Sequence, residues 1–191
     1  AVVYTHAHAD HTNGLDDLRQ IVFNRGSRLP VWADRATQDA LYARFGYAFS
    51  QPEESPYPPI LEMHTIAGDV TIPGAGGDLT LTPIRVWHGA GEALGFRVGA
   101  MAYLPDVSEM MDGDCWPLVE GLDLWILDAL RRSPHPTHLH LDKALEWIDH
   151  AAPRRAVLTN MHIDLDYRTL AAETPAHVTP AHDGLTLETR V

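Results

Sequence analysis

The stretch at residues 5–14, which reads T-H-A-H-A-D-H-T-N-G, constrains what this chain can fold into more than any other feature. It follows directly on an apolar run that is typical of a buried strand. In an extended chain His6 and His8 point to the same side, so both can reach one metal ion. The turn that follows can bring Asp10 and His11 toward a second ion.

Imidazole and carboxylate groups in this combination suit zinc, manganese or iron(II), and the lack of thiolate in the stretch argues against a purely structural zinc site. A single histidine at the end of a strand is more often a hydrogen-bonded surface or core residue than a ligand. The order H-x-H-x-D-H is different, because burying so many titratable groups without a metal would leave them unpaired. The stretch therefore predicts a metal site.

The composition is that of an ordinary globular protein. With 191 residues, 45% of them hydrophobic and 21% charged, we expect one domain over residues 1–191. The 14 Lys and Arg against 26 Asp and Glu give a net charge of −12, which disfavours nucleic acid as a partner. Two bound divalent ions would offset part of this charge locally, so a small anionic substrate such as a phosphate ester remains allowed.

Cysteine usage and hydropathy bound the location of the protein. Cys115 is the only cysteine, which excludes an internal disulfide and gives no indication of an oxidising compartment. No apolar run reaches the length of a membrane span, and no charged segment followed by an apolar stretch indicates a signal peptide. We therefore expect a cytoplasmic protein without a membrane partner. A homodimer is compatible with the sequence, which carries no signal for or against one.

In the first part of the chain, the apolar spacing predicts the order strand, helix, strand, helix. The first helix is expected to start near Gly14. A strand at residues 29–33 and a second helix at residues 35–45, ended by Gly46, are expected to follow. The residues expected to face inward are Leu15, Leu18, Ile21 and Val22 in the first helix and Ala36, Ala40, Leu41 and Phe45 in the second.

Residues 50–59 break this pattern, because they hold Pro52, Pro56, Pro58 and Pro59. Such a segment cannot be a helix or a central strand and is expected to run extended over the surface. Two interpretations stay open. The segment is either a solvated connector, or a lid or partner-contact loop near a functional site.

Strand signals dominate the rest of the chain, with helical patterns in between, and together they predict an α/β fold. The expected strands lie at residues 60–66, 69–72, 79–87, 94–98, 100–104, 122–127, 155–159 and 185–191. The expected helices lie at residues 141–150 and 167–172.

Candidate metal ligands recur where a strand gives way to a loop. His88, Asp106 and His162 each stand at or just after the end of an expected strand, as His6 and His8 do. Several strand ends that supply nitrogen and oxygen ligands are the way in which a sheet-based fold builds a two-metal site at one edge. Such a pair of ions activates a water and clamps the group under attack. The carboxylate of Asp106 is suited to hold the two ions together.

These motifs resemble the successive ligand motifs of the metallo-β-lactamase fold superfamily. The resemblance covers nearly the whole chain and rests on H-x-H-x-D-H at residues 6–11, His88, Y-L-P-D at residues 103–106, and His162. It implies the αββα sandwich of a binuclear hydrolase with two divalent ions, Zn or Mn, with Fe also compatible. The family places two or more strands ahead of the H-x-H-x-D-H strand, so we expect these N-terminal strands to be missing from this sequence. The implied ligands are His6, His8, His88 and Asp106 for one ion, and Asp10, His11, Asp106 and His162 for the other.

Four local features resemble the branch that contains the phosphoribosyl 1,2-cyclic phosphate phosphodiesterase. They are G-F-R-V-G at residues 95–99, the Y-L-P-D run, P-H-P-T-H at residues 134–138, and T-N-M-H-I-D-L-D-Y at residues 159–167. True β-lactamases usually carry an Arg in place of His11 and a Cys in place of Asp106. Thioesterases of the glyoxalase II type usually carry a Gly-His-Thr-x-Gly-His run around the third motif, and tRNA 3′-end endonucleases usually carry a basic, Gly-rich arm. These three branches are disfavoured.

The resemblance also implies a mechanism. A metal-bridging hydroxide attacks phosphorus, and an imidazole protonates the leaving alkoxide. The P-H-P-T-H loop aligns with a loop that carries a non-ligand active-site histidine, which assigns the imidazole role to His138. Asp10 is expected to take part in catalysis as well as in metal binding. The alternative for His138 is a surface histidine that caps the next helix, and His135 and His140 are weaker candidates.

We therefore predict a metal-dependent phosphodiesterase that acts on a small cyclic sugar phosphate, such as phosphoribosyl 1,2-cyclic phosphate. A lactonase or thioesterase of the same superfamily and a non-catalytic metal-binding accessory protein are the alternatives. Asp164 and Asp166, which closely follow His162, either orient a ligand imidazole or cap the helix that comes next.

Overall fold

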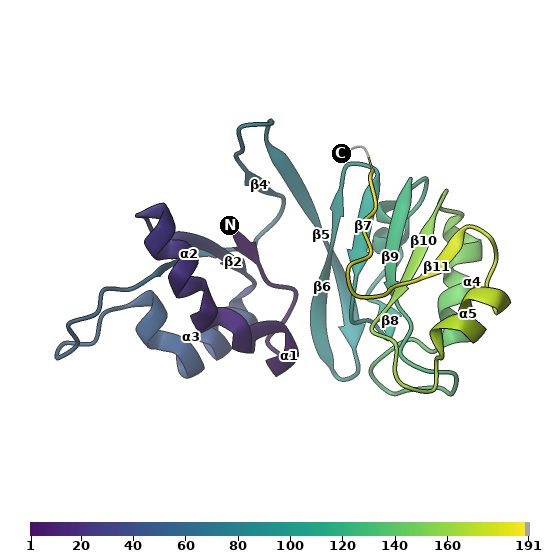
Figure 1. Ribbon diagram of the computed structural model, residues 1–191, viewed down its shortest axis with the longest axis horizontal. Coiled ribbons are helices and arrows are strands. Elements are labelled where there is room, and N and C mark those ends of the chain that lie inside the picture. Colours follow the sequence, from purple (N-terminus) through teal and green to yellow (C-terminus); the bar gives the residue numbers. More distant parts are fainter. Residues whose placement is uncertain (190–191) are drawn as a thin grey trace. The chain divides into compact units, whose positions relative to one another are not determined.

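The computed structural model describes residues 1–189 (Figure 1). The chain forms two compact units, one from Ala1 to Gly68 and one from Asp69 onward. Each unit has a β-sheet and a hydrophobic core of its own. Over the described residues, none of the helices has both the length and the apolar character needed to cross a membrane.

The first unit is built on a three-stranded parallel sheet in the order β1-β2-β3. The strands are β1 (Val2–Val3), β2 (Leu29–Ala33) and β3 (Leu61–Thr65). Leu29, Val31 and Ala33 alternate inward along β2 and are fully or almost fully buried. The strands predicted at the start of the chain and at residues 29–33 and 60–66 are therefore confirmed.

Three short helices replace the single helix predicted from Gly14. They are α1 (Ala9–Thr12), the 3₁₀-helix η1 (Asn13–Asp17) and α2 (Leu18–Arg25). Leu15 and Val22 are buried as predicted, but Ile21 is 48% exposed. A 3₁₀ turn holds 3.0 residues rather than 3.6, so η1 shifts the phase of the apolar face before α2 begins. The prediction assumed one helical period across residues 14–22, and for this reason it wrongly placed Ile21 on the buried face.

The second predicted helix is α3 (Arg35–Phe49), which begins where predicted and runs past Gly46. Its backbone kinks at Phe45, where φ is −129° and ψ is 27°. The Asp34 carboxylate caps its first turn by accepting a hydrogen bond from the Thr37 backbone N–H at 2.8 Å. The helix therefore bends where it was expected to stop.

Polar anchoring sets which face of α3 is buried. The side-chain amide of Gln38 is buried and donates to the Ala33 carbonyl and to Thr65 Oγ1, each at 2.9 Å. These bonds tie the helix to the ends of β2 and β3. They turn Ala36 toward solvent, so the prediction that Ala36 faces inward is wrong.

The Pro-rich segment at residues 50–59 forms neither a helix nor a strand, as predicted. Hydrogen bonds within the segment make its backbone turn. Gln51 Nε2 donates to the Ser55 carbonyl at 2.6 Å, and Ser55 Oγ accepts from the Tyr57 backbone N–H at 3.2 Å. Both interpretations of this loop, connector and lid, stay predictions.

The second unit contains a larger mixed sheet in the order β11-β10-β9-β7-β6-β5-β4, with β8 paired to β5. Its strands are β4 (Val70–Ile72), β5 (Leu79–His88), β6 (Gly91–Val98), β7 (Met101–Leu104), β8 (Glu109–Met110), β9 (Leu124–Asp128), β10 (Ala156–Thr159) and β11 (Val178–Pro180). Strands β7, β9, β10 and β11 run parallel, whereas β4, β5 and β6 pair antiparallel.

The strand directions bring several loop starts to one edge of this sheet. Leu104 of β7 pairs with Leu127 of β9, and Asp128 of β9 pairs with Thr159 of β10. Strand β5 runs in the same direction as β7, because two antiparallel pairings separate them. The carboxyl ends of β5, β7, β9 and β10 therefore share an edge, which is where ligand sites form in such sheets.

Helices pack beside the β9–β11 part of this sheet (Figure 1). They are α4 (Leu141–Ala151) and α5 (Tyr167–Glu173), and a 3₁₀-helix, η2 (Gly113–Leu118), precedes β9. The apolar stripe of α4 is buried in the core of the unit. Ala152, with φ at 48°, ends α4 in the left-handed conformation that a glycine more often supplies.

The G-F-R-V-G hairpin has a structural role in this unit. The guanidinium of Arg97 donates to the carbonyls of Gly99 at 2.9 Å and Leu118 at 3.0 Å, so it holds the end of η2. A side chain at Gly95 would meet Leu104 Cγ at 2.7 Å and the Tyr103 carbonyl at 2.8 Å. The close approach of β6 to β7 therefore requires glycine at this position.

The prediction of a last strand at residues 185–191 is wrong for the residues that the structure describes. Residues 185–189 form no strand, and residues 190–191 lie outside the described residues. On the side away from β9, the strand that pairs with β10 is β11, which the sequence did not predict. Strand β8 was also not predicted, because two or three residues are too few to display a period.

Candidate metal centre

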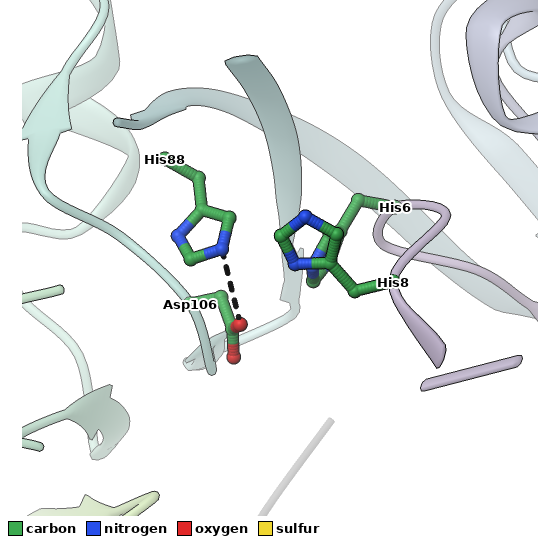
Figure 2. Close-up of side chains that lie close together, drawn as sticks. All are labelled: His6, His8, His88 and Asp106. Atoms are coloured by element: carbon green, nitrogen blue, oxygen red, sulfur yellow. Dashed lines mark ion pairs between the residues drawn. The ribbon is translucent and has the colours of Figure 1, made fainter. Parts of the chain in front are cut away.

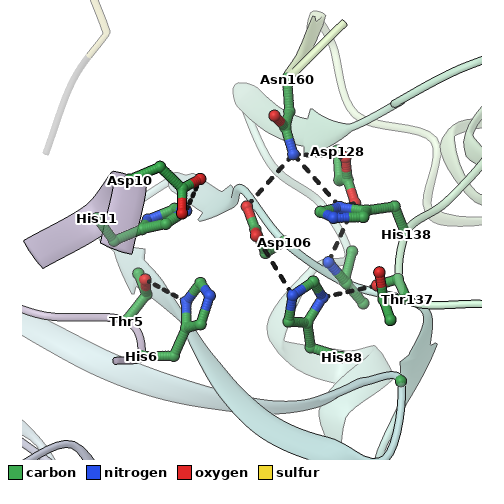
Figure 3. Close-up of polar contacts among 12 residues, drawn as sticks. Thr5, His6, Asp10, His11, His88, Asp106, Asp128, Thr137, His138 and Asn160 are labelled. Atoms are coloured by element: carbon green, nitrogen blue, oxygen red, sulfur yellow. Dashed lines mark hydrogen bonds and ion pairs between the residues drawn. The ribbon is translucent and has the colours of Figure 1, made fainter. Parts of the chain in front are cut away.

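Three imidazoles of the opening motif gather at the end of β1. The ring centroids of His6 and His8 lie 4.5 Å apart, and those of His6 and His11 lie 4.4 Å apart. His6 is buried, and its Nδ1 lies 3.1 Å from Thr5 Oγ1 (Figure 3). The H-x-H-x-D-H stretch thus converges within the first unit, although its residues belong partly to the strand exit and partly to α1.

The second half of the motif stands on α1. Asp10 lies in the first turn of this helix, and its Oδ2 is 3.3 Å from His11 Nε2 (Figure 3). The Asp10 carboxylate is largely exposed. Thr12 Oγ1 donates to the His8 carbonyl at 2.8 Å, which holds the helix against the strand exit. The first unit therefore offers three imidazoles and an accessible carboxylate close to one another.

In the second unit, His88 and Asp106 form a buried pair. His88 is the last residue of β5, and Asp106 stands two residues beyond β7. His88 Nε2 lies 3.6 Å from Asp106 Oδ2 (Figure 2). The other ring nitrogen, Nδ1, lies 2.6 Å from the Thr137 carbonyl oxygen.

This contact decides which nitrogen of His88 carries hydrogen. A carbonyl oxygen only accepts, so Nδ1 is the donor, and Nε2 is the nitrogen that faces the Asp106 carboxylate. Two electron-rich atoms that face each other in a buried place are stable with a proton or a cation between them. A metal ion fits this donor set, because imidazole nitrogen and carboxylate oxygen suit zinc, manganese and iron.

A second histidine and carboxylate lie beside this pair. Asp128 ends β9 and is fully buried, and its Oδ2 accepts a hydrogen bond from His138 Nδ1 at 2.9 Å (Figure 3). The same oxygen accepts from the backbone N–H groups of Val107 at 3.2 Å and Leu139 at 3.3 Å. Burial raises the pKa of Asp128, and the hydrogen bond from His138 opposes that rise. His138 is therefore held through Nδ1, and its Nε2 points away from the carboxylate.

An amide bridges the two carboxylates. Asn160 follows β10 in the left-handed conformation, with φ at 61°, which asparagine tolerates better than most residues. Its Nδ2 lies 3.4 Å from Asp106 Oδ1 and 3.4 Å from Asp128 Oδ1 (Figure 3). Neither Asp128 nor Asn160 was predicted from the sequence to be a site residue.

The structure separates the two interpretations of Asp164 and Asp166. His162 is exposed, and its Nδ1 lies 3.4 Å from Asp164 Oδ1, so Asp164 is in place to orient the ring. Asp166 instead caps α5 and accepts from the Thr169 backbone N–H at 2.9 Å. This hydrogen bond holds the pKa of the Asp166 carboxyl below its ordinary value.

The other imidazoles of the P-H-P-T-H region differ in their surroundings. His135 lies with its ring centroid 5.3 Å from that of His138, and its Nδ1 accepts from the Thr137 backbone N–H at 3.3 Å. Partial burial, then Arg131 and His138, lower the pKa of His135. His140 precedes α4 at the N-cap position without a side-chain capping bond. Among residues 1–189, neither has the buried carboxylate partner that His138 has.

Comparisons with known proteins agree with this geometry. Residues 1–163 match the family described as "Beta-lactamase superfamily domain". The match covers most of the chain, and the chain belongs to this superfamily. The fold class predicted from the sequence is thereby confirmed.

Within the superfamily, the chain is similar to a solved structure described as "a New Diphosphatase from the PhnP Family". The two are 35% identical with a TM-score of 0.87, over 99% of this chain and 71% of that one. This similarity confirms the predicted resemblance to the branch that contains the phosphoribosyl 1,2-cyclic phosphate phosphodiesterase, which is called here the PhnP family. The metallo-β-lactamase fold protein YhfI from Bacillus subtilis, with 18% identity and a TM-score of 0.73 over 96% of this chain and 75% of that one, shares the fold.

One curated relative is named for an acyl-transfer activity rather than for hydrolysis. The chain is 33% identical over 190 residues to an octanoyltransferase from Porphyromonas gingivalis. The match covers 97% of this chain and 37% of that protein, so the chain spans well under half the length of this relative. The name describes the whole of that protein, most of which has no counterpart in this chain.

Proposed function

We propose that this chain is a binuclear metal-dependent hydrolase that cleaves a phosphoester bond in a small anionic substrate. Membership of the superfamily supports the hydrolase assignment, and the donor chemistry of His88 with Asp106 supports the metal. The residues proposed to hold the ions are His6, His8, His88 and Asp106 for one, and Asp10, His11, Asp106 and His162 for the other.

When bound, a pair of divalent ions supplies a water of lowered pKa and neutralises charge on the oxygens of the attacked group. The side chains of the protein supply the rest. The accessible Asp10 carboxylate is suited to accept a proton from the attacking water. His138 is suited to donate a proton from Nε2 to the leaving oxygen, because its Nδ1 is engaged by Asp128.

One observation supports a substrate whose leaving group needs a proton. The ring centroid of His138 lies 4.6 Å from that of the ligand candidate His88, yet His138 is fixed by a carboxylate of its own. Such a fixed imidazole beside the metal ligands suits the protonation of an alkoxide, which is a poor leaving group without a proton. Acyl esters also release an alkoxide, so the similarity to a diphosphatase is what favours attack on phosphorus over attack on an acyl carbon.

The proposed substrate is a small cyclic sugar phosphate, as the branch resemblance implies. A compact anionic ester is compatible with a net charge of −12, because two bound cations offset charge at the site alone. A long polyanion such as nucleic acid would meet the negative surface as a whole. We propose the same cytoplasmic setting that the sequence suggested, in which small phosphate esters are available.

A second candidate is the hydrolysis of an acyl ester or thioester, and one observation favours it. The octanoyltransferase relative acts on an acyl group according to its name. This observation is the weaker of the two, because the chain matches 37% of that relative but 71% of the diphosphatase.

The two candidates are separated by assaying one substrate panel. The purified protein, loaded with defined Mn or Zn, is offered a cyclic sugar phosphate, a linear phosphodiester, a diphosphate, a thioester, a lactone and a β-lactam. Turnover of the phosphoesters is expected. Thioester or lactone turnover without phosphoester turnover would contradict the proposal. Tight metal binding without turnover of any substrate would favour a metal-binding accessory protein.

A further inference from the structure

The loop that carries His138 also touches the ligand candidate His88. The carbonyl oxygen of Thr137 accepts the hydrogen bond from His88 Nδ1 at 2.6 Å, across 49 positions in the sequence. The next residue, His138, donates to Asp128. A single peptide unit therefore connects a metal-ligand candidate with the proposed proton donor.

Glycine at position 89 makes this approach feasible. Gly89 directly follows β5 and has φ at +67°, a backbone conformation that residues with a side chain seldom adopt. A Cβ at this position would lie 2.6 Å from Thr137 Cγ2 and 3.6 Å from the Pro136 carbonyl oxygen. Two carbon atoms cannot lie 2.6 Å apart without a bond, so a side chain at position 89 would force the Thr137 side chain or the loop that carries it to shift.

The loop is held in place at both of its ends. Arg131 donates from Nε to the Ser133 carbonyl at 3.1 Å and from a terminal nitrogen to the Pro134 carbonyl at 2.6 Å. On the other side, the Leu130 backbone N–H donates to the Leu139 carbonyl at 2.9 Å. Prolines on either side of His135 restrict the backbone further. The Thr137 carbonyl is therefore presented by a stiff loop rather than by a mobile one.

We propose that the Gly89–Thr137 contact is a positioning device that sets the orientation and tautomer of His88, and with it the affinity of the metal site. Thr137 acts through its backbone carbonyl, and Gly89 acts by leaving room for it. The inference rests on the proposed function, in which His88 binds metal. Backbone carbonyls and carboxylates that orient a ligand imidazole change metal affinity by roughly 10- to 100-fold when they are lost.

The structure offers a matched set of variants. Gly89→Ala introduces the clash. Gly121→Ala is the control for backbone strain, because Gly121 has φ at +63° and a Cβ there would have open space within 4 Å among the described residues. Thr137→Ala removes the clashing methyl group but keeps the carbonyl. The double variant Gly89→Ala/Thr137→Ala removes the contact at 2.6 Å and leaves separations of 3.4 and 3.6 Å.

Metal affinity is measured by competition with a chelator, with Mn or Zn and no substrate. Gly89→Ala is expected to weaken binding on the order of 10- to 100-fold. Gly121→Ala and Thr137→Ala are expected to bind like the wild type, and the double variant is expected to recover part of the loss. Equal losses in Gly89→Ala and Gly121→Ala, or a loss in Thr137→Ala as large as that in Gly89→Ala, would overturn the inference.

Nuclear magnetic resonance of the metal-free wild type gives a readout that needs no variant. At a pH well above the ordinary histidine pKa of about 6.5, the ring of His88 is expected as the Nδ1–H tautomer. The Nε2–H tautomer would overturn the inference even if Gly89→Ala failed to fold. A wild type that binds metal but hydrolyses nothing would contradict the proposed function and leave this inference standing.

Discussion

Asp128 determines which nitrogen of His138 faces outward. A buried carboxylate that accepts from Nδ1 at 2.9 Å fixes the orientation of the ring. Nε2 is then the ring nitrogen available to a substrate. This pairing makes His138 a better candidate for proton donation than His135 or His140, which lie on the same loop.

The first prediction concerns His138→Ala. We expect turnover to fall on the order of 10²- to 10⁴-fold, because a general acid is lost, while the bound metal stays at the wild-type level. Rates are measured together with metal content by elemental analysis. His140→Ala, in the same loop, is the control and is expected to keep its activity. Loss of metal from His138→Ala would make this residue a ligand, and an unchanged rate would remove it from the mechanism.

The second prediction concerns the stability that Asp128 provides. Asp128→Ala removes the acceptor of the Val107 and Leu139 backbone N–H groups and leaves both donors buried. We expect a loss of about 1–3 kcal/mol in the free energy of unfolding. Urea denaturation measures it. Asp128→Asn keeps an acceptor oxygen and should lose less; equal losses in the two variants would contradict this account of the two hydrogen bonds.

At the residue scale, sequence could name the ligand candidates but not their supports. Asp128 follows the apolar run L-D-L-W-I-L much as Asp106 follows the run that ends at Leu104, so a signal for it was present. Asn160 lies within a recognised motif that gave it no role of its own. The Thr137 carbonyl could not be predicted, because a backbone oxygen has no sequence signature. Only the packing of the loop against Gly89 brings it to His88.

Capping explains how α5 begins directly after the His162 segment. The Asp166 carboxylate accepts hydrogen bonds from the Thr169 backbone N–H at 2.9 Å and the Thr169 hydroxyl at 2.8 Å. The backbone bond is the largest cause of the lowered Asp166 pKa. Because the folded-state pKa is below the unfolded value of about 3.9, the stabilisation is present above that pH and is lost as the pH falls through the lowered pKa.

The third prediction follows from this direction. Asp166→Ala is expected to melt at a lower temperature than the wild type at neutral pH, and the difference is expected to shrink as the pH falls below about 4. Thermal unfolding of both proteins across this range is the measurement. Asp164→Ala, which does not cap α5, is the control. A difference between wild type and Asp166→Ala that stays constant down to the acid limit would contradict the capping role.

Among the elements, sequence predicted those with a long period or a clear cap. The predicted strand at residues 79–87 and the helix at residues 141–150 appear with ends shifted by one residue. The prediction was wrong where tertiary structure changes the local period. The 3₁₀-helix η1 turned Ile21 outward, and α3 bent at Phe45 instead of ending at Gly46.

At the scale of the whole molecule, the candidate ligands divide between the two units. The first unit supplies His6, His8, Asp10 and His11 from one short stretch. The second unit supplies its candidates from the shared edge of separate strands, and it adds supporting groups on Asp128, Asn160 and the Thr137 loop. Each set is organised by the hydrogen bonds and hydrophobic core of its own unit.

The superfamily was identifiable from sequence because its ligand motif is compact. H-x-H-x-D-H occupies residues 6–11, and so many titratable groups in six positions are costly to bury unless they bind metal. The substrate was not identifiable in the same way, because specificity depends on side chains that no single motif collects. The chain forms two compact units. The expectation of one domain over residues 1–191 stays a prediction.

The most direct test of the central claim is anomalous X-ray diffraction from crystals of the metal-loaded protein, recorded at the absorption edge of the added Mn or Zn. The account predicts two neighbouring ions that share the Asp106 carboxylate, one of them bound by His88 and the other by His162. A single ion, or ions bound elsewhere with His88 and Asp106 in contact with neither, would contradict it.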